Sequence, residues 1–267
     1  MKAAGKVSLA ILLLISLLSF SAPIISQYDP DRIDLESIKE SPSLKHPFGT
    51  DNKGRDIFSR VLYGGRISIG IAIIAAFFSM GIGLIVGLCS GYFGGKIDTA
   101  IMALVDLVLS FPALLLAIGV SIVLPTGIYT VIIAITAVGW ASFSRLIRGY
   151  LLTLKEAPFV EAAKALGCSD LRILFIHLLP HCIPLTFIMM GLKLGGYILT
   201  EASLSFLGLG AQPPTATWGS MVSANRAYIS TSPWMVLFPG LMIALTALCF
   251  NIVGDTLRDR FGLRLRG

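Results

Sequence analysis

The sequence predicts an all-α membrane protein with six transmembrane helices, and two observations support this prediction. Apolar residues make up 55% of the chain and charged residues only 13%, whereas soluble domains carry about 25% charged residues. Apolar runs also recur along the chain, most of them close to the ~20 residues that a helix needs to cross a bilayer. The six predicted spans are residues 7–25, 67–90, 99–124, 127–146, 183–209 and 233–254.

The first apolar run has two interpretations. It follows Lys2 and Lys6, and Ser19-Phe20-Ser21 fits the small-x-small cleavage site of a signal peptide. The run is also long enough to cross a bilayer. Both interpretations place the following segment outside the cell membrane. We favour an uncleaved first transmembrane helix over residues 1–26.

Residues 27–66 form a polar segment that we expect on the extracytoplasmic side. It contains the sequence GTDNKGRD, which departs from a phosphate-binding loop in two places: Arg55 replaces the lysine and Asp56 replaces the magnesium-binding hydroxyl. No β-rich segment precedes it, and ATP lies on the other side of the membrane. We therefore assign no nucleotide binding here. The motif residues are Gly49, Thr50, Asp51, Gly54, Arg55 and Asp56.

Residues 67–257 are predicted to form the main transmembrane domain. Gly83, Gly87 and Gly91 recur at four-residue intervals in its first helix, a spacing that allows another helix to pack closely. Pro112 is expected to perturb the next helix, because proline removes a backbone donor. Residues 210–232 are read as a proline-rich outer loop, and the four cysteines, which form no CxxC pair, as unpaired.

The net charge of +6 reflects membrane topology rather than nucleic-acid binding. The basic residues flank apolar runs instead of forming one stripe, and the short inner segments carry most of them, as the positive-inside rule requires. Both termini are therefore predicted to be cytoplasmic, with residues 258–267 as a cytoplasmic tail.

Residues 156–180 are predicted to form a cytoplasmic elbow of two short helices between the fourth and fifth spans. Pro158 suits a first helical position, and Gly167 suits the left-handed conformation just past a helix end. Ser169 or Asp170 is then expected to cap a second helix. That helix would place Leu171, Leu174, Phe175 and Leu178 on one face and end at Pro180 and Pro184. On periodicity alone, an amphipathic helix lying on the lipid surface fits equally well.

The spacing of Glu161-Ala162-Ala163, Gly167 and Leu179-Pro180 resembles the EAA motif of ABC importer permeases. His177 stands where the general pattern has isoleucine, as in the peptide/nickel branch. The GTDxxGRD segment, followed by Ser59-Arg60, resembles the N-terminal signature of that branch. The tail sequence NIVGDTLRDR resembles the ending of the same family, except that Phe261-Gly262 replaces the usual Asp-Pro. Together these motifs resemble the C-type subunit of dipeptide, oligopeptide and nickel importers, the binding-protein-dependent inner-membrane components.

This resemblance implies a permease in the cytoplasmic (inner) membrane of a prokaryote that imports peptides, with nickel as the alternative cargo. It implies that the elbow couples to ATPases through Glu161, Ala162, Ala163, Gly167, Leu179 and Pro180. The implied partners are a second homologous permease, two cytoplasmic ATPases that carry ATP and magnesium, and an extracytoplasmic solute-binding protein. No cofactor is expected on this chain, which has no nucleotide-binding motif of its own.

Three charges fall within predicted spans, where charged side chains cost about 2.5–3.5 kcal/mol on insertion scales. They are Asp106, Lys193 and Glu201. One interpretation is that each pairs with a neighbouring helix and fixes packing. The other is that they line the translocation path or take part in gating. A remote alternative makes them the ion-coupling residues of a stand-alone secondary transporter.

The sequence favours neither a metal site nor an enzyme. His177 and His181 have a spacing that suits zinc, but Pro180 lies between them and no convincing third ligand is near. Neither a Ser-His-Asp arrangement nor a carboxylate pair can be argued from the sequence.

Overall fold

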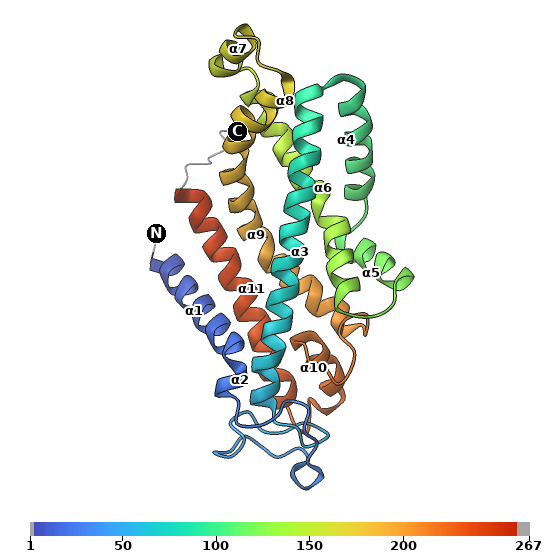
Figure 1. Cartoon of the computed structure of the whole chain (residues 1–267). Coiled ribbons are helices and arrows are strands. Elements are labelled where there is room, and N and C mark those ends of the chain that lie inside the picture. The colour runs from blue at the N-terminus through green and yellow to red at the C-terminus, as the bar shows by residue number, and fades with distance from the viewer. Residues whose placement is uncertain (1–2, 261–267) are drawn as a thin grey trace.

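The computed structural model describes residues 3–260, and its helices form one elongated bundle (Figure 1). Residues 27–56 close one end of the bundle, and α7 and α8 stand at the other end. The elements are α1 Ala3–Phe20, α2 Ala22–Ile25, η1 Leu35–Ser37, α3 Ile57–Phe93, α4 Gly95–Ser110, α5 Ala113–Val123, α6 Ile128–Leu154, α7 Pro158–Ala165, α8 Asp170–Arg172, η2 Ile173–Leu178, α9 Leu179–Phe206, α10 Trp218–Asn225, η3 Arg226–Tyr228 and α11 Trp234–Arg260.

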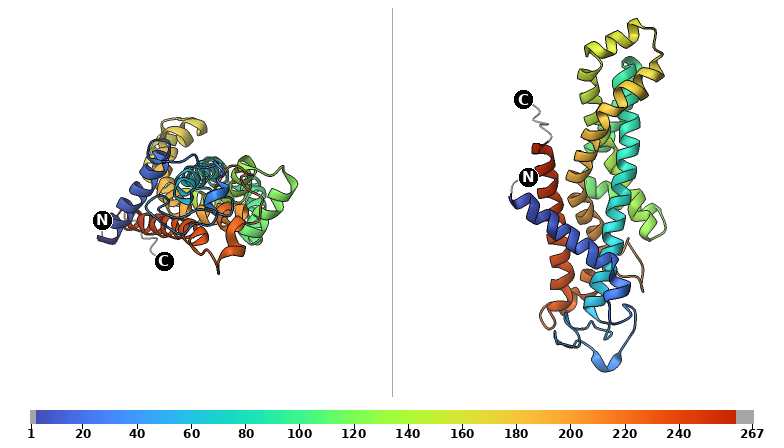
Figure 2. Two further views of the ribbon diagram at one scale, coloured as in Figure 1. Left: turned by 90° about the horizontal axis from the view of Figure 1, so that it is seen from below. Right: turned by 60° about the vertical axis from the view of Figure 1, so that its left-hand side comes forward.

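Five helical segments are long and apolar enough to cross a membrane: α1, α3, α6, the continuous run from α8 to α9, and α11. The sixth span is formed by α4 and α5 if the two count as one broken helix. Within residues 3–260 the secondary structure is helical, apart from one isolated bridge between Thr50 and Asp56. The predicted all-α fold is confirmed. The described ends of α1 and α11 lie on the same side of the bundle (Figure 2).

The second span starts earlier than predicted, at Ile57 rather than at residue 67. Asp56 caps its first turn by accepting a hydrogen bond from the Ser59 backbone amide at 2.8 Å. The sequence prediction started this helix too late because Arg60 and Arg66 made its first turns resemble a polar loop. In the structure the Arg60 side chain is buried against the outer segment.

The predicted glycine ridge packs against α6. A Cβ atom added to Gly87 would lie 2.7 Å from the Ser144 carbonyl oxygen and 2.8 Å from the Ile147 Cβ atom. A Cβ atom added to Gly83 would likewise crowd Phe143, and one added to Gly91 would crowd Leu151. These three glycines let α3 and α6 approach closely, so the packing prediction is confirmed.

The third span is not one straight helix over residues 99–124. α4 ends at Ser110, and α5 begins at Ala113 after a bend of 94°. Phe111 is extended because the ring of Pro112 disfavours helical geometry in the preceding residue. The bend leaves α5 lying across the bundle rather than along it (Figure 1).

Residues 210–232 are not simply a loop, because they contain α10 and η3. Thr217 begins α10 with a capping box, in which its hydroxyl and that of Ser220 each accept a hydrogen bond from the other residue's backbone amide. Trp218 is fully buried and donates from Nε1 to the Val61 carbonyl oxygen at 2.9 Å. The prolines and glycines of this segment led to the prediction of a loop, whereas the segment contains a helix that is hydrogen-bonded to α3 through Trp218.

Candidate functional site

The first helix of the elbow ends in a Schellman motif. α7 begins with Pro158 and is followed by Gly167, whose φ is +78°. The Gly167 amide donates to the Lys164 carbonyl oxygen at 2.9 Å, and the Cys168 amide donates to that of Ala163 at 3.1 Å. Both local predictions, proline at the start and left-handed glycine at the end, are confirmed. The chain therefore reverses over few residues and returns directly toward the bundle.

The inner side of the elbow is a packed apolar cluster. Val160 and Ala163 of α7 are buried against Ile173, Leu174 and Leu178 of the returning helix. The same cluster continues into the bundle through Leu88 of α3 and through Ile147 and Leu151 of α6. Through these side chains, and through Cys182 of α9, the elbow is joined to three long helices by shared packing.

Two side-chain contacts add to this attachment. The Tyr92 hydroxyl of α3 donates to Asp170 Oδ1 at 2.6 Å. The ring of Phe159 in α7 lies 5.2 Å from the ring of His181 in α9, measured between centroids. These contacts hold both arms of the elbow in one orientation.

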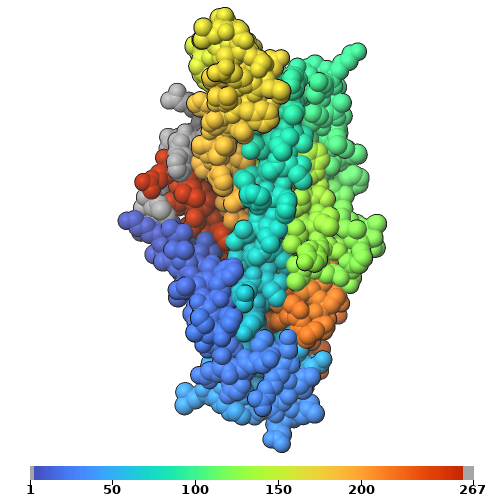
Figure 3. Space-filling model, viewed as in Figure 1, coloured from blue at the N-terminus to red at the C-terminus, as the bar shows by residue number. Residues whose placement is uncertain are grey.

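The outer side of the elbow is apolar and exposed. Leu166 at the tip is 83% exposed, and Leu171, Phe175 and Ile176 are each more than half exposed. Glu161 and Ala162 are exposed as well, whereas Ala163 faces inward. The space-filling view shows the elbow projecting beyond the rest of the bundle (Figure 3). An exposed apolar surface on a projecting element is typical of a protein-binding site.

The second arm of the elbow, formed by α8 and η2, differs from the prediction. Neither Ser169 nor Asp170 caps it through a side chain, since the Asp170 carboxylate is held by Tyr92. Leu171 and Phe175 are exposed, while Ile173 lies in the buried face with Leu174 and Leu178. The predicted single apolar face is therefore split between an inner and an outer surface.

The prolines do not end this arm, which runs on into α9. Residues 173–178 form π-helix, and the Leu179 amide donates to the Leu174 carbonyl oxygen. The wider turn brings Pro180 into the first turn of α9, where its missing N–H needs no partner. Leu179 and Pro180 thus mark a π-to-α junction between the elbow and the span, and Pro184 is tolerated inside α9.

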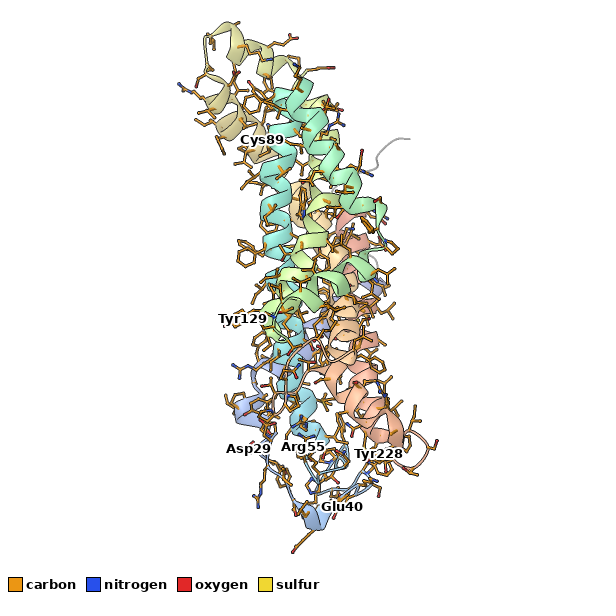
Figure 4. All side chains as sticks on the ribbon, turned by 90° about the vertical axis from the view of Figure 1, so that its right-hand side faces the viewer. Asp29, Glu40, Arg55, Cys89, Tyr129 and Tyr228 are labelled. Atoms are coloured by element: carbon orange, nitrogen blue, oxygen red, sulfur yellow. The ribbon has the colours of Figure 1, made fainter. Side chains whose placement is uncertain are left out.

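The GTDxxGRD motif builds a compact cap at the opposite end of the bundle. Asp51 is buried and accepts hydrogen bonds from the backbone amides of Lys53 and Arg55, and from Arg55 Nε at 2.7 Å. Gly49 and Gly54 have positive φ, and a Cβ atom on Gly54 would lie 1.6 Å from the Asp34 carbonyl oxygen. Thr50 Oγ1 donates to the Ser37 carbonyl oxygen at 2.5 Å. Figure 4 shows Arg55 at this end with Asp29 and Glu40.

The last residues of this motif join the cap to α3. Asp56 is buried and accepts from the Ser59 amide and hydroxyl, at 2.8 and 2.7 Å, with His46 Nδ1 at 2.9 Å. Arg60 donates to the Pro30 carbonyl oxygen at 2.7 Å, to Asp31 at 2.9 Å and to the Pro214 carbonyl oxygen at 3.4 Å. A carboxylate occupies the helix terminus that a phosphate-binding loop would offer to phosphate. The motif therefore organises the end of the molecule that residues 27–56 close.

The three charged residues that the sequence placed within predicted spans lie in three different environments. Asp106 on α4 is exposed and forms an ion pair with Arg145 of α6. Lys193 on α9 lines a cavity of about 120 Å³ between α4, α5, α6 and α9. Glu201 is fully buried near α10 and accepts from the Ser205 hydroxyl at 2.7 Å, with Ser68 and Thr217 beside it. They do not form one site.

Sequence reasoning missed a charged link between α4 and α6. Arg148 Nε and Nη2 donate to the two carboxylate oxygens of Asp98 at 2.6 Å each, and the Ser90 hydroxyl also donates to Asp98. Asp98 lay just outside the predicted third span. The two residues are 50 positions apart in the chain, so no local sequence pattern could predict their pairing.

His177 is half-buried, and His181 is exposed on α9, where its ring faces that of Phe159. Across residues 3–260, no group of three or more His, Cys, Asp or Glu side chains is arranged to hold a metal ion. Cys89, Cys168, Cys182 and Cys249 are unpaired, as predicted.

Comparison with known proteins gives a consistent result. Residues 79–267 match the family of binding-protein-dependent transport system inner membrane components. The chain is 42% identical to the oligopeptide transport system permease protein OppC of Bacillus subtilis (strain 168), over 97% of this chain and 85% of that protein. It is 43% identical to the glutathione transport system permease protein GsiD of Escherichia coli O6:K15:H31, over 97% and 86%.

A third relative and one solved structure agree with these matches. A putative peptide transport system permease protein of Brucella suis biovar 1 is 40% identical, over 98% of this chain and 88% of that protein. The fold is similar to a chain of the inward-facing MetNI methionine ABC transporter, with a TM-score of 0.60 and 18% identity, over 75% of this chain and 95% of that chain.

Proposed function

The chain belongs to the family of binding-protein-dependent transport system inner membrane components, and from this premise we propose that it imports peptides as the permease subunit of an ATP-driven transporter. It is a multi-pass protein of the prokaryotic inner membrane. The names of its relatives support a peptide cargo, because OppC serves oligopeptides and GsiD serves glutathione, itself a tripeptide.

The proposed assembly has four kinds of chain. This permease pairs with a second, homologous permease, and two cytoplasmic ATPases carry ATP and magnesium. A solute-binding protein delivers cargo on the extracytoplasmic side. This chain itself binds no cofactor in the proposal, since its one loop similar to a phosphate-binding loop ends in Asp56, whose carboxylate caps α3. Separate subunits would therefore supply the energy.

The observation that carries the proposal is the exposed apolar elbow on a rigid base. Leu166, Phe175 and Ile176 present a surface that suits insertion into a groove of another protein. Glu161 and Ala162 flank that surface, and Gly167 fixes the reversal behind it. Closure of the ATPases would move this surface as a unit, because the inner side is packed against α3 and α6.

The movement has a continuous route into the membrane. The second arm of the elbow becomes α9 without a break in the helix, through the π-to-α junction at Leu179 and Pro180. α9 carries Lys193 and Glu201, and its outer end packs with α10. A displacement at the elbow would thus reach both the middle of the bundle and its outer cap. The Gly49–Asp56 motif would keep that cap ordered for docking of the binding protein.

Transport in reconstituted vesicles tests the proposal. The complex purified with all of its subunits is placed in vesicles with the binding protein and a radiolabelled tripeptide outside. We expect uptake that requires ATP on the ATPase side and continues when ion gradients are collapsed. Uptake that persists without ATP and follows an imposed ion gradient would instead indicate a secondary transporter. Radioactive nickel in place of the tripeptide distinguishes the two cargo classes.

A further inference from the structure

The cavity beside Lys193 contains a cation without a counterion. Lys193 is half-buried on α9, and within residues 3–260 no carboxylate forms an ion pair with it. Isolated charges within a membrane domain are costly unless they face a partner or a polar cavity. The acidic side chain nearest in the sequence, Glu201, lies about two turns along α9 in a different, fully buried setting. Lys193 is therefore available to an anion from outside this chain.

A second polar group, the Tyr197 hydroxyl, lies in the lining of the same cavity. Tyr197 lies one turn beyond Lys193 and is 8% exposed, and its hydroxyl lies beside the Ser79 hydroxyl of α3. The hydroxyl lies directly over Gly139, where an added Cβ atom would approach it to 2.1 Å. A hydroxyl rotates to suit its acceptor, so Tyr197 can donate either to Ser79 or to an acceptor that enters the cavity beside Lys193.

The shape of the cavity limits what this acceptor can be. Its volume of about 120 Å³ is well below the ~300 Å³ at which ordinary small-molecule sites begin. It therefore suits one functional group rather than a whole cargo molecule. The hydroxyl groups of Thr200 and Ser142 also line the cavity, but they donate to the Gly196 and Gly139 carbonyl oxygens. Lys193 with the Tyr197 hydroxyl beside it suits a carboxylate.

The ion pair between Asp106 and Arg145 lies next to this cavity on the elbow side. Leu109 and Ser142 line the cavity, and Asp106 and Arg145 stand one helical turn from them on α4 and α6. Because α4 runs away from the elbow and α6 runs toward it (Figure 1), both turns lead toward the elbow. Asp106 already neutralises the charge of Arg145. In this part of the described structure, Lys193 is therefore the cation without an ion-pair partner.

We propose that Lys193 and Tyr197 form a carboxylate-binding subsite for the cargo, which receives the C-terminal carboxylate of a peptide during translocation. The proposal rests on the proposed peptide import and adds the group of the cargo that the permease recognises. The rest of the peptide stays outside this small cavity, so side chains of many kinds are compatible with it. The other source of a carboxylate is an acidic residue of the second permease.

The test compares two probes in vesicles, trialanine and trialanine amide, each at a concentration that saturates the binding protein. The wild-type complex is expected to take up the free acid faster than the amide. In Lys193→Met this ratio should fall roughly tenfold or more, the value of a hydrogen bond to a charged group. Lys193→Arg should keep most of the ratio, and Tyr197→Phe should reduce it partially. The control is Lys96→Met, which removes an exposed cation at the start of α4.

Each outcome decides the proposal. An unchanged acid-to-amide ratio in Lys193→Met and Tyr197→Phe overturns the subsite while leaving peptide import standing. Loss of the second permease from purified Lys193→Met complexes, with the ratio unchanged in the complexes that remain, assigns the carboxylate to that subunit and overturns a cargo role. Absence of uptake of both probes by the wild-type complex overturns peptide import and the subsite together.

Discussion

The backbone amide of Cys168 donates to the carbonyl oxygen of Ala163 at 3.1 Å, and this bond closes the Schellman motif that reverses the chain at the tip of the elbow. It requires Gly167 between the two residues to adopt a φ of +78°. The exposed side chains on both arms of the elbow depend on this reversal for their relative positions. The conformation of one glycine thereby determines the surface that we propose meets the ATPase.

Substitution of Gly167 is expected to uncouple transport. Gly167→Asp places a side chain at a left-handed position, which costs about 1–2 kcal/mol, and adds a charge to the apolar tip. We expect normal amounts of the protein in the membrane but at least a tenfold loss of peptide uptake and of co-purifying ATPase. Gly208→Asp is the matched control, because Gly208 has a φ of +80° and equally open surroundings in the turn beyond the opposite end of α9. Normal uptake by Gly167→Asp would contradict the coupling role.

The glycine ridge on α3 predicts a position-dependent loss of stability. Gly87→Ala would bring a methyl group within 2.7 Å of the Ser144 carbonyl oxygen and force α3 away from α6. We expect a loss of about 1–3 kcal/mol, as in other overpacked sites, measured by unfolding in detergent. Gly81→Ala on the same helix meets no atom within 4 Å and should be neutral or slightly stabilising. Equal effects of the two substitutions would refute the close packing.

The outer cap is expected to depend on Asp56. Asp56→Ala removes the acceptor for the Ser59 amide, the Ser59 hydroxyl and the His46 ring. Loss of a buried, charged acceptor should cost about 1–3 kcal/mol and make residues 27–56 more sensitive to added protease. Glu36→Ala, an exposed position in the same segment, should leave protease resistance unchanged. If both variants are cleaved at the wild-type rate, the cap does not rely on this carboxylate.

Glu201 is expected to act through hydrogen bonding rather than charge. It is fully buried, and no basic side chain in the described structure pairs with it. Glu201→Gln keeps the shape and an acceptor for Ser205, so we expect uptake within about twofold of wild type. Glu201→Ala leaves the neighbouring hydroxyls without that acceptor and should cost about 1–3 kcal/mol in unfolding experiments. A severe transport defect in the stable glutamine variant would show instead that the charge itself is needed.

The sequence predicted the features that depend on local chemistry. Apolar runs marked the spans, Pro158 and Gly167 marked the ends of α7, and Gly83, Gly87 and Gly91 marked a packing face. Each is a property of a few neighbouring residues, so tertiary structure did not have to be known.

The features that the sequence did not reveal depend on partners distant in the chain or on unusual backbone geometry. The pairing of Arg148 with Asp98 joins α6 to α4, and the surroundings of Tyr197 are set by Gly139 on α6. The π-helical turn allows Pro180 to start α9, whereas an ordinary α-helical reading ends a helix there. Similarly, α10 was concealed among the prolines and glycines of the outer segment.

The central claim is that the elbow couples this chain to separate ATPases, and purification from native membranes tests it most directly. A tagged chain is extracted in a mild detergent, and the co-purifying proteins are identified by mass spectrometry. We expect two ATPase subunits and a second permease with the wild-type chain, and loss of the ATPases when Leu166 and Phe175 are both changed to aspartate. A chain that purifies alone and still transports peptide in vesicles without ATP would contradict the account.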